Sequence, residues 1–165
     1  MRTILHDLDN KEIKKLKFNE DDVVINCNEC KNSCIGCFSC WIKTPKICAL
    51  KDNFKNMTTY LKNSSDFIII SKNRYGCYSE PIKRVLERCI GYVLPYFTIR
   101  NGAIHHKLRY NNKLNFITFF YGDLDKNDSI VLNNLVKANA INLGAKDYKV
   151  ICHKDIEEIK NVYFN

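Results

Sequence analysis

The stretch Phe67-Ile68-Ile69-Ile70-Ser71 decides the fold of this 165-residue chain. It is an unbroken apolar run of strand length, and such runs are typical of strands buried on both faces of a parallel sheet. The polar cluster Asn63-Ser64-Ser65-Asp66 stands directly before it. Residues of these types favour turns and loops, so the preceding element is expected to end there. The run therefore predicts a central strand of a parallel sheet.

Working outward, strands and helices alternate along the rest of the chain. Further strands are predicted over 3–5, 23–27, 116–121 and 148–152. Between them, apolar residues recur at helical spacing over 54–61, 79–94, 129–143 and 156–162, and 11–16 is expected to form a polar helical turn. Five alternations of strand and helix predict an α/β fold, an open parallel sheet with helices on both faces. We expect a single domain over 1–165, with a cysteine-rich loop at 27–48.

The helix predicted over 79–94 has signals at both ends. Ser79 is a candidate N-cap and Pro81 lies in the first turn, while Pro95 is expected to end the helix. The helix that follows 116–121 has Asp128 or Ser129 as its candidate cap and Gly144 as its C-cap. In open parallel sheets ligands bind at the carboxyl ends of the strands. The loops after 5, 27, 71 and 121 are therefore the candidate site.

Composition excludes several classes of protein. The chain is 45% hydrophobic and 27% charged, which argues against disorder. Its net charge is +8, yet the lysines are scattered and form no basic block, so no nucleic-acid partner is expected. The apolar runs are too short to cross a membrane, and the first residues lack a signal peptide. A cytoplasmic protein without membrane contact is the expectation.

Six of the nine cysteines lie between residues 27 and 48. Cys34, Cys37 and Cys40 form a CxxCxxC motif, and Cys48 follows seven residues later. Three closely spaced thiolates and one distant thiolate suit the separate iron corners of an iron–sulfur cluster. Zinc, a redox disulfide and plain buried thiols remain open alternatives, and Cys27 and Cys30 add a further CxxC that suits thiol redox chemistry.

The cysteine motif, continued by Trp41, resembles that of the flavodoxin-like FMN reductases and their iron–sulfur flavoprotein relatives. Two further stretches share the resemblance: Ser65-Asp66 before the 67–71 strand, and Tyr75-Gly76-Cys77-Tyr78-Ser79 leading to Lys83 and Leu86-Glu87-Arg88. It covers roughly residues 23–125. It implies a three-layer α/β/α sandwich with a five-stranded parallel sheet in the order 2-1-3-4-5, and a homodimer.

The resemblance also implies a function. Such proteins pass electrons between NAD(P)H or a ferredoxin-type donor, FMN and an acceptor. By analogy, the flavin ring would lie against 73–78 and approach the end of the 116–121 strand. The implied cofactor-binding residues are Asn73, Arg74, Tyr75, Gly76, Cys77, Tyr78, Tyr121 and Gly122, and a [4Fe-4S] cluster would be held by Cys34, Cys37, Cys40 and Cys48. Independently of the analogy, Gly76 lets backbone amides approach a planar ring, and Tyr75 and Tyr78 are suited to stack on one. No catalytic side chain is predicted.

The first loop departs from the family pattern. The family binds the FMN phosphate in a hydroxyl- and glycine-containing turn after the first strand, at a helix N-terminus. Here that turn reads His6-Asp7-Leu8-Asp9-Asn10-Lys11, with two carboxylates and no hydroxyl or glycine. Either FMN is held differently, with Lys or Arg from a second subunit, or flavin binding has been lost. The alternative function is a flavin-free interaction module whose cysteine loop is structural or binds a metal.

Two smaller patterns carry less weight. His105 and His106 are expected to be two surface histidines in a polar loop. Asp123, Asp125 and Asp128 are spaced like part of a calcium loop, but the required glycine and terminal glutamate are missing. These aspartates are therefore predicted to be turn and cap residues.

Overall fold

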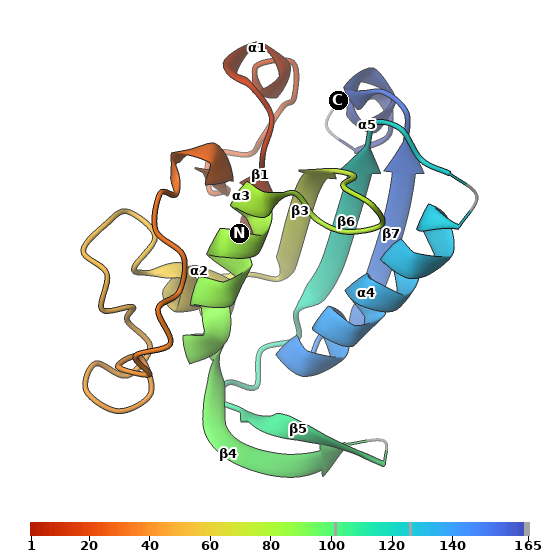
Figure 1. Ribbon diagram of the computed structural model, residues 1–165. Coiled ribbons are helices and arrows are strands. Elements are labelled where there is room, and N and C mark those ends of the chain that lie inside the picture. The colour runs from red at the N-terminus through yellow and green to blue at the C-terminus, as the bar shows by residue number, and fades with distance from the viewer. Residues whose placement is uncertain (101, 126, 164–165) are drawn as a thin grey trace.

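A five-stranded parallel sheet forms the centre of the protein, in the order β2-β1-β3-β6-β7 (Figure 1). The computed structural model describes residues 1–163 except 101 and 126. The strands are β1 (Arg2–His6), β2 (Val23–Asn26), β3 (Asp66–Lys72), β6 (Asn115–Tyr121) and β7 (Asp147–His153). All four pairings are parallel, with Ile68 opposite Ile4 on one side and Ile117 on the other. The predicted strand order is confirmed, because the strands of the sheet taken in sequence follow 2-1-3-4-5.

Side chains of the central strand alternate between two cores. Phe67 and Ile69 pack into the larger core, and Ile68 and Ile70 into the smaller one. All four are nearly inaccessible to water, as the unbroken apolar run predicted. A strand that is apolar on both faces can only be stable with a layer on each side, which the helices provide.

The larger core is covered by α2 (Met57–Asn63), α3 (Glu80–Glu87) and α4 (Asp128–Leu143). The smaller core is covered by the segment around α1 (Asn10–Ile13) and by α5 (Ile156–Tyr163). The predicted three-layer sandwich is thus present, with a short first helix. Gly144 ends α4 in the left-handed conformation at φ 65°, as predicted.

The helix predicted over 79–94 is shorter than expected. α3 ends at Glu87, and the 3₁₀ segment η2 (Arg88–Tyr92) leads into β4 (Val93–Arg100). β4 pairs with β5 (Ala103–Leu108) as an antiparallel hairpin that extends away from the sheet at the bottom of Figure 1. Pro95 therefore lies within a strand rather than beyond a helix. Ser79 stands at the N-cap position of α3, but its side chain makes no capping hydrogen bond.

The cysteine-rich segment at 27–48 begins with the 3₁₀ turn η1 (Cys27–Glu29) and continues as a loop beside α3. Four rings join this loop to the hairpin: Phe38 stacks on Trp41, Trp41 contacts His106, and His106 contacts Phe97, with centroids 5.2, 5.2 and 4.8 Å apart. We call these four rings the ring row. It ties two segments that lie far apart in the sequence.

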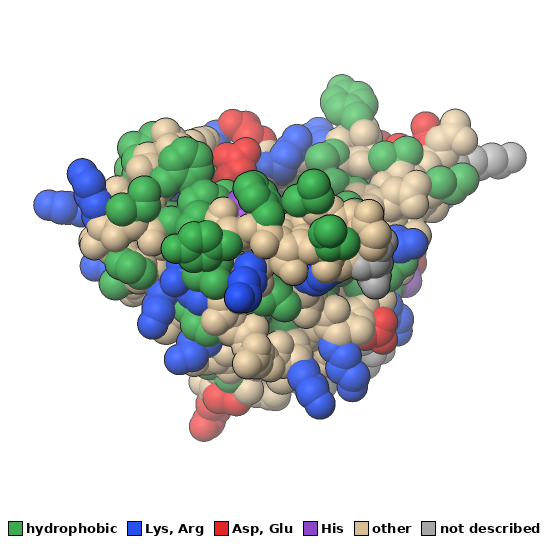
Figure 2. All heavy atoms as spheres, turned by 90° about the horizontal axis from the view of Figure 1, so that it is seen from below, with side chains coloured by type: hydrophobic (Ala, Val, Ile, Leu, Met, Phe, Trp, Pro, Cys, Tyr) green, Lys and Arg blue, Asp and Glu red, His purple; other side chains and the backbone are tan. Residues whose placement is uncertain are grey.

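Both segments joined by the ring row expose apolar side chains to solvent. The exposed residues are Ile35, Phe38, Ile42 and Ile47 in the loop and Tyr96, Phe97, Ile99 and Ile104 in the hairpin. The view from below in Figure 2 shows hydrophobic side chains gathered on this side of the molecule. None of the described helices is both long and apolar enough to cross a bilayer.

Candidate functional site

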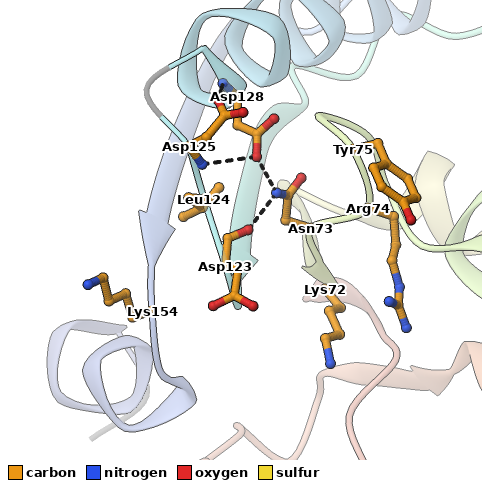
Figure 3. A pocket seen from close by; sticks show the side chains of 9 residues that line it. All are labelled: Lys72, Asn73, Arg74, Tyr75, Asp123, Leu124, Asp125, Asp128 and Lys154. Carbon is orange, nitrogen blue, oxygen red and sulfur yellow. Dashed lines mark hydrogen bonds between the residues drawn. The ribbon is translucent and has the colours of Figure 1, made fainter.

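A cavity of about 750 Å³ opens at the carboxyl edge of the sheet. It lies between the loop that follows β3 and the loop that follows β6, with Lys154 beyond β7 at one side (Figure 3). A second cavity of about 410 Å³ lies on the other side of the β3 loop, toward Asp7 and the start of α3. Lys72, Arg74 and Tyr75 line both cavities. The two cavities therefore lie at the carboxyl edge of the sheet, the region in which parallel sheets bind ligands, and they share the 72–75 segment.

Asn73 fixes the β3 loop in place. Its side-chain amide donates hydrogen bonds to the carbonyl of Asp123 at 2.8 Å and to Oδ2 of Asp128 at 2.7 Å (Figure 3). Its side-chain oxygen accepts from the backbone N–H of Gly76 at 3.1 Å. Asn73 is buried, so these bonds use its polar atoms inside the protein. This residue shapes the site and has no free donor to offer a ligand.

Gly76 and Tyr78 also serve the structure of the loop. Gly76 has φ 70°, and a Cβ at this position would meet Cγ1 of Val131 at 3.0 Å, so only glycine fits here. Its N–H donates to the side-chain oxygen of Asn73, so this amide is bonded within the loop. Tyr78 is 2% exposed and stacks on Phe120, and burial raises its pKa to about 12. Its ring packs into the larger core, and the residue also lines the second cavity.

Arg74 and Tyr75 form the open side of the loop. Tyr75 is fully exposed, and its backbone has φ 54°, a conformation that costs a residue with a side chain about 1 kcal/mol. The turn is closed by hydrogen bonds in both directions between Arg74 and Cys77, whose thiol is half-buried. Among the described residues, neither Lys72 nor Arg74 has an ion-pair partner. An aromatic ring and two cations thus stand unpartnered at the rim of both cavities.

Tyr121 links the end of β6 to the loop after β1. Its hydroxyl donates to Oδ1 of Asp7 at 3.0 Å, and the backbone N–H of Lys72 donates to Oδ2 of the same carboxylate at 2.9 Å. Burial and the neighbouring Asp7 raise the pKa of Tyr121, so it remains a donor. Gly122 has φ 97° and donates its N–H to the carbonyl of Lys154. Of these predicted cofactor-binding residues, Tyr121 lines the second cavity.

The loop after β1 is closed by its own carboxylate. Asp9 is the N-cap of α1, and its Oδ1 accepts from the backbone N–H groups of Lys11 and Glu12 at 2.7 and 2.8 Å. Glu12 returns a bond from its carboxylate to the N–H of Asp9 at 3.0 Å, which completes a capping box. The amides of the first turn are therefore already bound to an anion that is part of the chain.

The loop after β6 carries the three predicted turn aspartates. Oδ1 of Asp125 accepts from the N–H groups of Asn127 and Asp128, so Asp125 fixes the start of α4. Asp128 accepts from Asn73 and from the N–H of Asp125, and its side chain does not cap the helix. The structure places Asn127 at the N-cap instead of Asp128 or Ser129. Three carboxylates and the three cations Lys72, Arg74 and Lys154 line the larger cavity, so its formal charges balance.

The cysteine motif lies in a second region, away from the two cavities. Cys37 is exposed, and hydrogen bonds from Ser39 lower its pKa. Burial raises the pKa of Cys40, and the nearby thiols of Cys48, Cys34 and Cys37 raise it further. The other three thiols of the motif therefore lie near Cys40. Among the described residues, however, no three His, Cys, Asp or Glu side chains are placed to hold one metal ion together.

The upstream pair Cys27 and Cys30 is buried in the larger core. Burial raises the pKa of Cys27 well above its ordinary value, which makes the reactive thiolate scarce. Next to Cys30, the buried side chain of Arg88 forms an ion pair with Asp52 at 2.6 Å. These surroundings are those of structural thiols and do not favour the thiol redox alternative. His105 and His106 lie on β5 rather than in a loop, and His106 belongs to the ring row.

No family model and no curated protein matches this chain. Among solved structures, it is similar to an FMN-dependent NADH-azoreductase from Bacillus anthracis in complex with FMN, with a TM-score of 0.57 and 14% identity over 97% of this chain and 92% of that one. It is also similar to an NADH:FMN oxidoreductase in its apo form, with a TM-score of 0.55 and 8% identity over 97% and 83% of the two chains. This is a flavodoxin-like fold. At such identities the similarity concerns the arrangement of the chain.

Two features of the loops that line these cavities were not part of the sequence prediction. The bonds of Asn73 to the β6 loop could not be foreseen, because they join residues some fifty positions apart. The cap at Asp9 had a signal in the sequence, since an N-cap residue followed three positions later by glutamate is the pattern of a capping box.

Proposed function

We propose that this chain is a flavin-dependent oxidoreductase of the NAD(P)H:FMN reductase type. The observation that carries this proposal is Tyr75, a fully exposed ring held by a left-handed backbone at the rim of two cavities. An aromatic side chain placed in water at a cost in backbone strain is expected where a ligand ring covers it. The two similar structures named above support a flavin as that ligand.

The residues of the β3 loop fit a flat ring. Tyr75 would stack on the flavin, and Arg74 and Lys72 would face its polar edge as hydrogen-bond donors. Asn73 and Gly76 would fix the position of this segment relative to the β6 loop, because Asn73 is hydrogen-bonded to both. A bound flavin supplies the two-electron chemistry, with NAD(P)H as the expected donor. The chain itself binds and orients the ring and shields one face from water.

The residues of the β1 loop do not fit the phosphate of FMN. A phosphate at this end of the sheet would need the amides that Asp9 already occupies, and it would meet the carboxylate of Asp7. No part of the proposed function therefore depends on a phosphate held there.

The iron–sulfur cluster on Cys34, Cys37, Cys40 and Cys48 remains a prediction. The proximity of the thiols of Cys34, Cys37 and Cys48 to Cys40 supports it. Against it, no three metal-binding side chains among the described residues are placed to hold one ion. Iron analysis of anaerobically purified protein tests it, with Cys40→Ala expected to lose iron and Cys89→Ala, a buried thiol of the larger core, expected to retain it.

A homodimer is the proposed assembly. The hairpin exposes Phe97, Ile99 and Ile104, and exposed apolar residues grouped on an extended element are typical of protein interfaces. Sedimentation measures this directly. Phe97→Asp together with Ile104→Asp is expected to yield monomers, because both charges would be buried in the interface.

The second candidate function is a flavin-free interaction module. The closed β1 loop and the exposed apolar side chains of the loop and hairpin favour it. A colourless protein that fails to take up flavin but retains a stable assembly would support this candidate over an oxidoreductase.

Flavin titration of the purified full chain tests the proposed function. We expect quenching of flavin fluorescence, and oxidation of NADH or NADPH once flavin is added. Tyr75→Ala should weaken flavin binding about tenfold, since stacking on an aromatic side chain contributes about 1–3 kcal/mol. Tyr96→Ala is the matched control, because Tyr96 is 67% exposed but lies on the hairpin. Equal losses in both variants, or no binding by the unmodified protein, would overturn the proposal.

A further inference from the structure

The hydrogen bonds within the β1 loop affect which flavin this protein can bind. Two backbone N–H groups of the first turn of α1, those of Lys11 and Glu12, point at Oδ1 of Asp9. These bonds lower the pKa of Asp9, so the carboxylate is ionised at neutral pH. A phosphate at this turn would have to compete with the carboxylate of Asp9 for these N–H groups. That carboxylate cannot diffuse away, because it is part of the same turn.

Asp7 places a second carboxylate in the β1 loop, next to the sheet. Its carboxylate accepts from the backbone N–H of Lys72 and from the hydroxyl of Tyr121, so it is bonded to both β3 and β6. Asn28 adds a bond from its side-chain amide to the carbonyl of Asp7 at 3.0 Å. The loop is therefore tied to two neighbouring strands and to the turn η1, and an incoming dianion would face Asp7 and Asp9 together.

The larger cavity offers a phosphate no net attraction either. Lys72, Arg74 and Lys154 are matched there by Asp123, Asp125 and Asp128. By contrast, the exposed ring of Tyr75 is available to any isoalloxazine, whether or not the ligand carries a phosphate. Recognition of the ring and recognition of the phosphate are thus separated in this chain.

We infer that the protein selects its flavin by the ring alone and binds riboflavin as tightly as FMN. This inference rests on the proposed function, since it concerns the ligand of the same cleft. A flavin whose side chain ends in a hydroxyl group carries no negative charge, so the carboxylates of Asp7 and Asp9 in the β1 loop do not repel it. The expected ligand is therefore a neutral flavin without a phosphate, such as riboflavin. FMN is expected to bind as well, but with no gain in affinity from its phosphate.

Parallel titrations of the full chain with riboflavin and with FMN test the inference by flavin fluorescence and calorimetry. We expect the two dissociation constants to agree within about tenfold, a ratio that a few charge-assisted bonds to a phosphate would exceed. FMN binding more than tenfold tighter would overturn the inference and leave the proposed function standing. Binding of neither flavin would overturn the proposed function itself.

Asp9→Ser sharpens the test, because serine retains the cap while it removes the charge. We expect this variant to bind FMN about fivefold more tightly, as the loss of one nearby like charge predicts, and riboflavin no differently. Asp147→Ser makes the same change at the opposite edge of the sheet, at the start of β7, and should alter neither affinity. An Asp9→Ser variant with unchanged FMN affinity, or with both affinities raised equally, would overturn the inference.

Discussion

The loops after β1 and β3 lie at the same edge of one sheet and are bonded to each other, yet they are built for opposite purposes. In the β1 loop, the carboxylates of Asp7, Asp9 and Glu12 all accept hydrogen bonds from the chain itself. In the β3 loop, the bonds of Asn73 support a turn that presents Tyr75 and Arg74 to solvent. The contrast teaches that two loops at one edge of a sheet can differ in kind, one closed by its own polar groups and the other presenting side chains to solvent.

The largest expected effect comes from removing the support of the open loop. Asn73→Ala deletes three hydrogen bonds, one of them to the carboxylate of Asp128, and leaves the buried N–H of Gly76 unpaired, so we expect a loss of about 4 kcal/mol in the free energy of unfolding. Urea denaturation measures it. Asn63→Ala, at the exposed end of α2, is the control and should cost well under 1 kcal/mol. A small loss at Asn73 would mean that the β3 loop does not depend on its tie to the β6 loop.

Acidification should act on the closed loop through His6. Burial lowers the pKa of this histidine to about 4, against about 6.5 in the unfolded chain. The unfolded state therefore takes up the proton first, so the contribution of His6 is fully present above pH 6.5 and is lost as the pH falls to 4. The loss amounts to about 3 kcal/mol, from the difference between the two pKa values.

Urea midpoints between pH 7 and pH 4 measure this effect. His6→Asn should remove the corresponding part of the pH dependence, whereas His105→Asn, a change on the hairpin, should leave the profile as it is. Identical profiles for the unmodified protein and His6→Asn would contradict the prediction.

A smaller effect is expected where the two loops meet. Tyr121→Phe removes one of the two donors to the carboxylate of Asp7 and should cost about 1–2 kcal/mol, because hydrogen bonds to charged groups are stronger than neutral ones. Tyr110→Phe is the control, since its buried hydroxyl has no hydrogen-bond partner among the described residues. If both variants unfold at the same urea concentration, the bond between Tyr121 and Asp7 contributes nothing measurable.

The smallest change in stability is expected at the exposed ring. Tyr75→Gly removes the left-handed strain, partly offset by the greater freedom of glycine in the unfolded chain, and should stabilise the protein by about 0.5 kcal/mol. Tyr96→Gly places glycine within β4 and should destabilise by about 1 kcal/mol. A clear loss of stability in Tyr75→Gly would show that the ring supports the fold and is not held ready for a ligand.

The sheet could be predicted from the sequence because its central strands carry their own evidence. The run 67–70 is apolar at every position and 116–121 at every position except Thr118, and only a two-sided core satisfies that pattern. The hairpin could not be read in the same way, because Val93 and Leu94 continue the helical spacing of α3 and Pro95 looks like a helix end. The dipeptide Asn101-Gly102 was the available signal, since Asn-Gly favours the two-residue turn of a hairpin.

The candidate site shows where prediction from local sequence ends. Tyr75 and Tyr78 stand three positions apart in a loop without periodicity, and the sequence offers no reason to bury one and expose the other. Residues distant in the sequence determine which tyrosine is buried: Phe120 stacks on Tyr78, and Val131 packs next to Gly76. The sequence could name the loop, but the packing of β6 and α4 determines which of its side chains remain free.

The ring row has a practical consequence. Trp41 is the only tryptophan of the chain, and its indole N–H donates to the carbonyls of Ile90 and Val93 at 3.1 and 2.9 Å. Its intrinsic emission therefore reports whether the cysteine-rich loop is seated on the 3₁₀ segment and the hairpin. Trp41 lines neither of the two cavities at the carboxyl edge of the sheet. Its fluorescence can therefore report detachment of the cysteine-rich loop separately from ligand binding at those cavities.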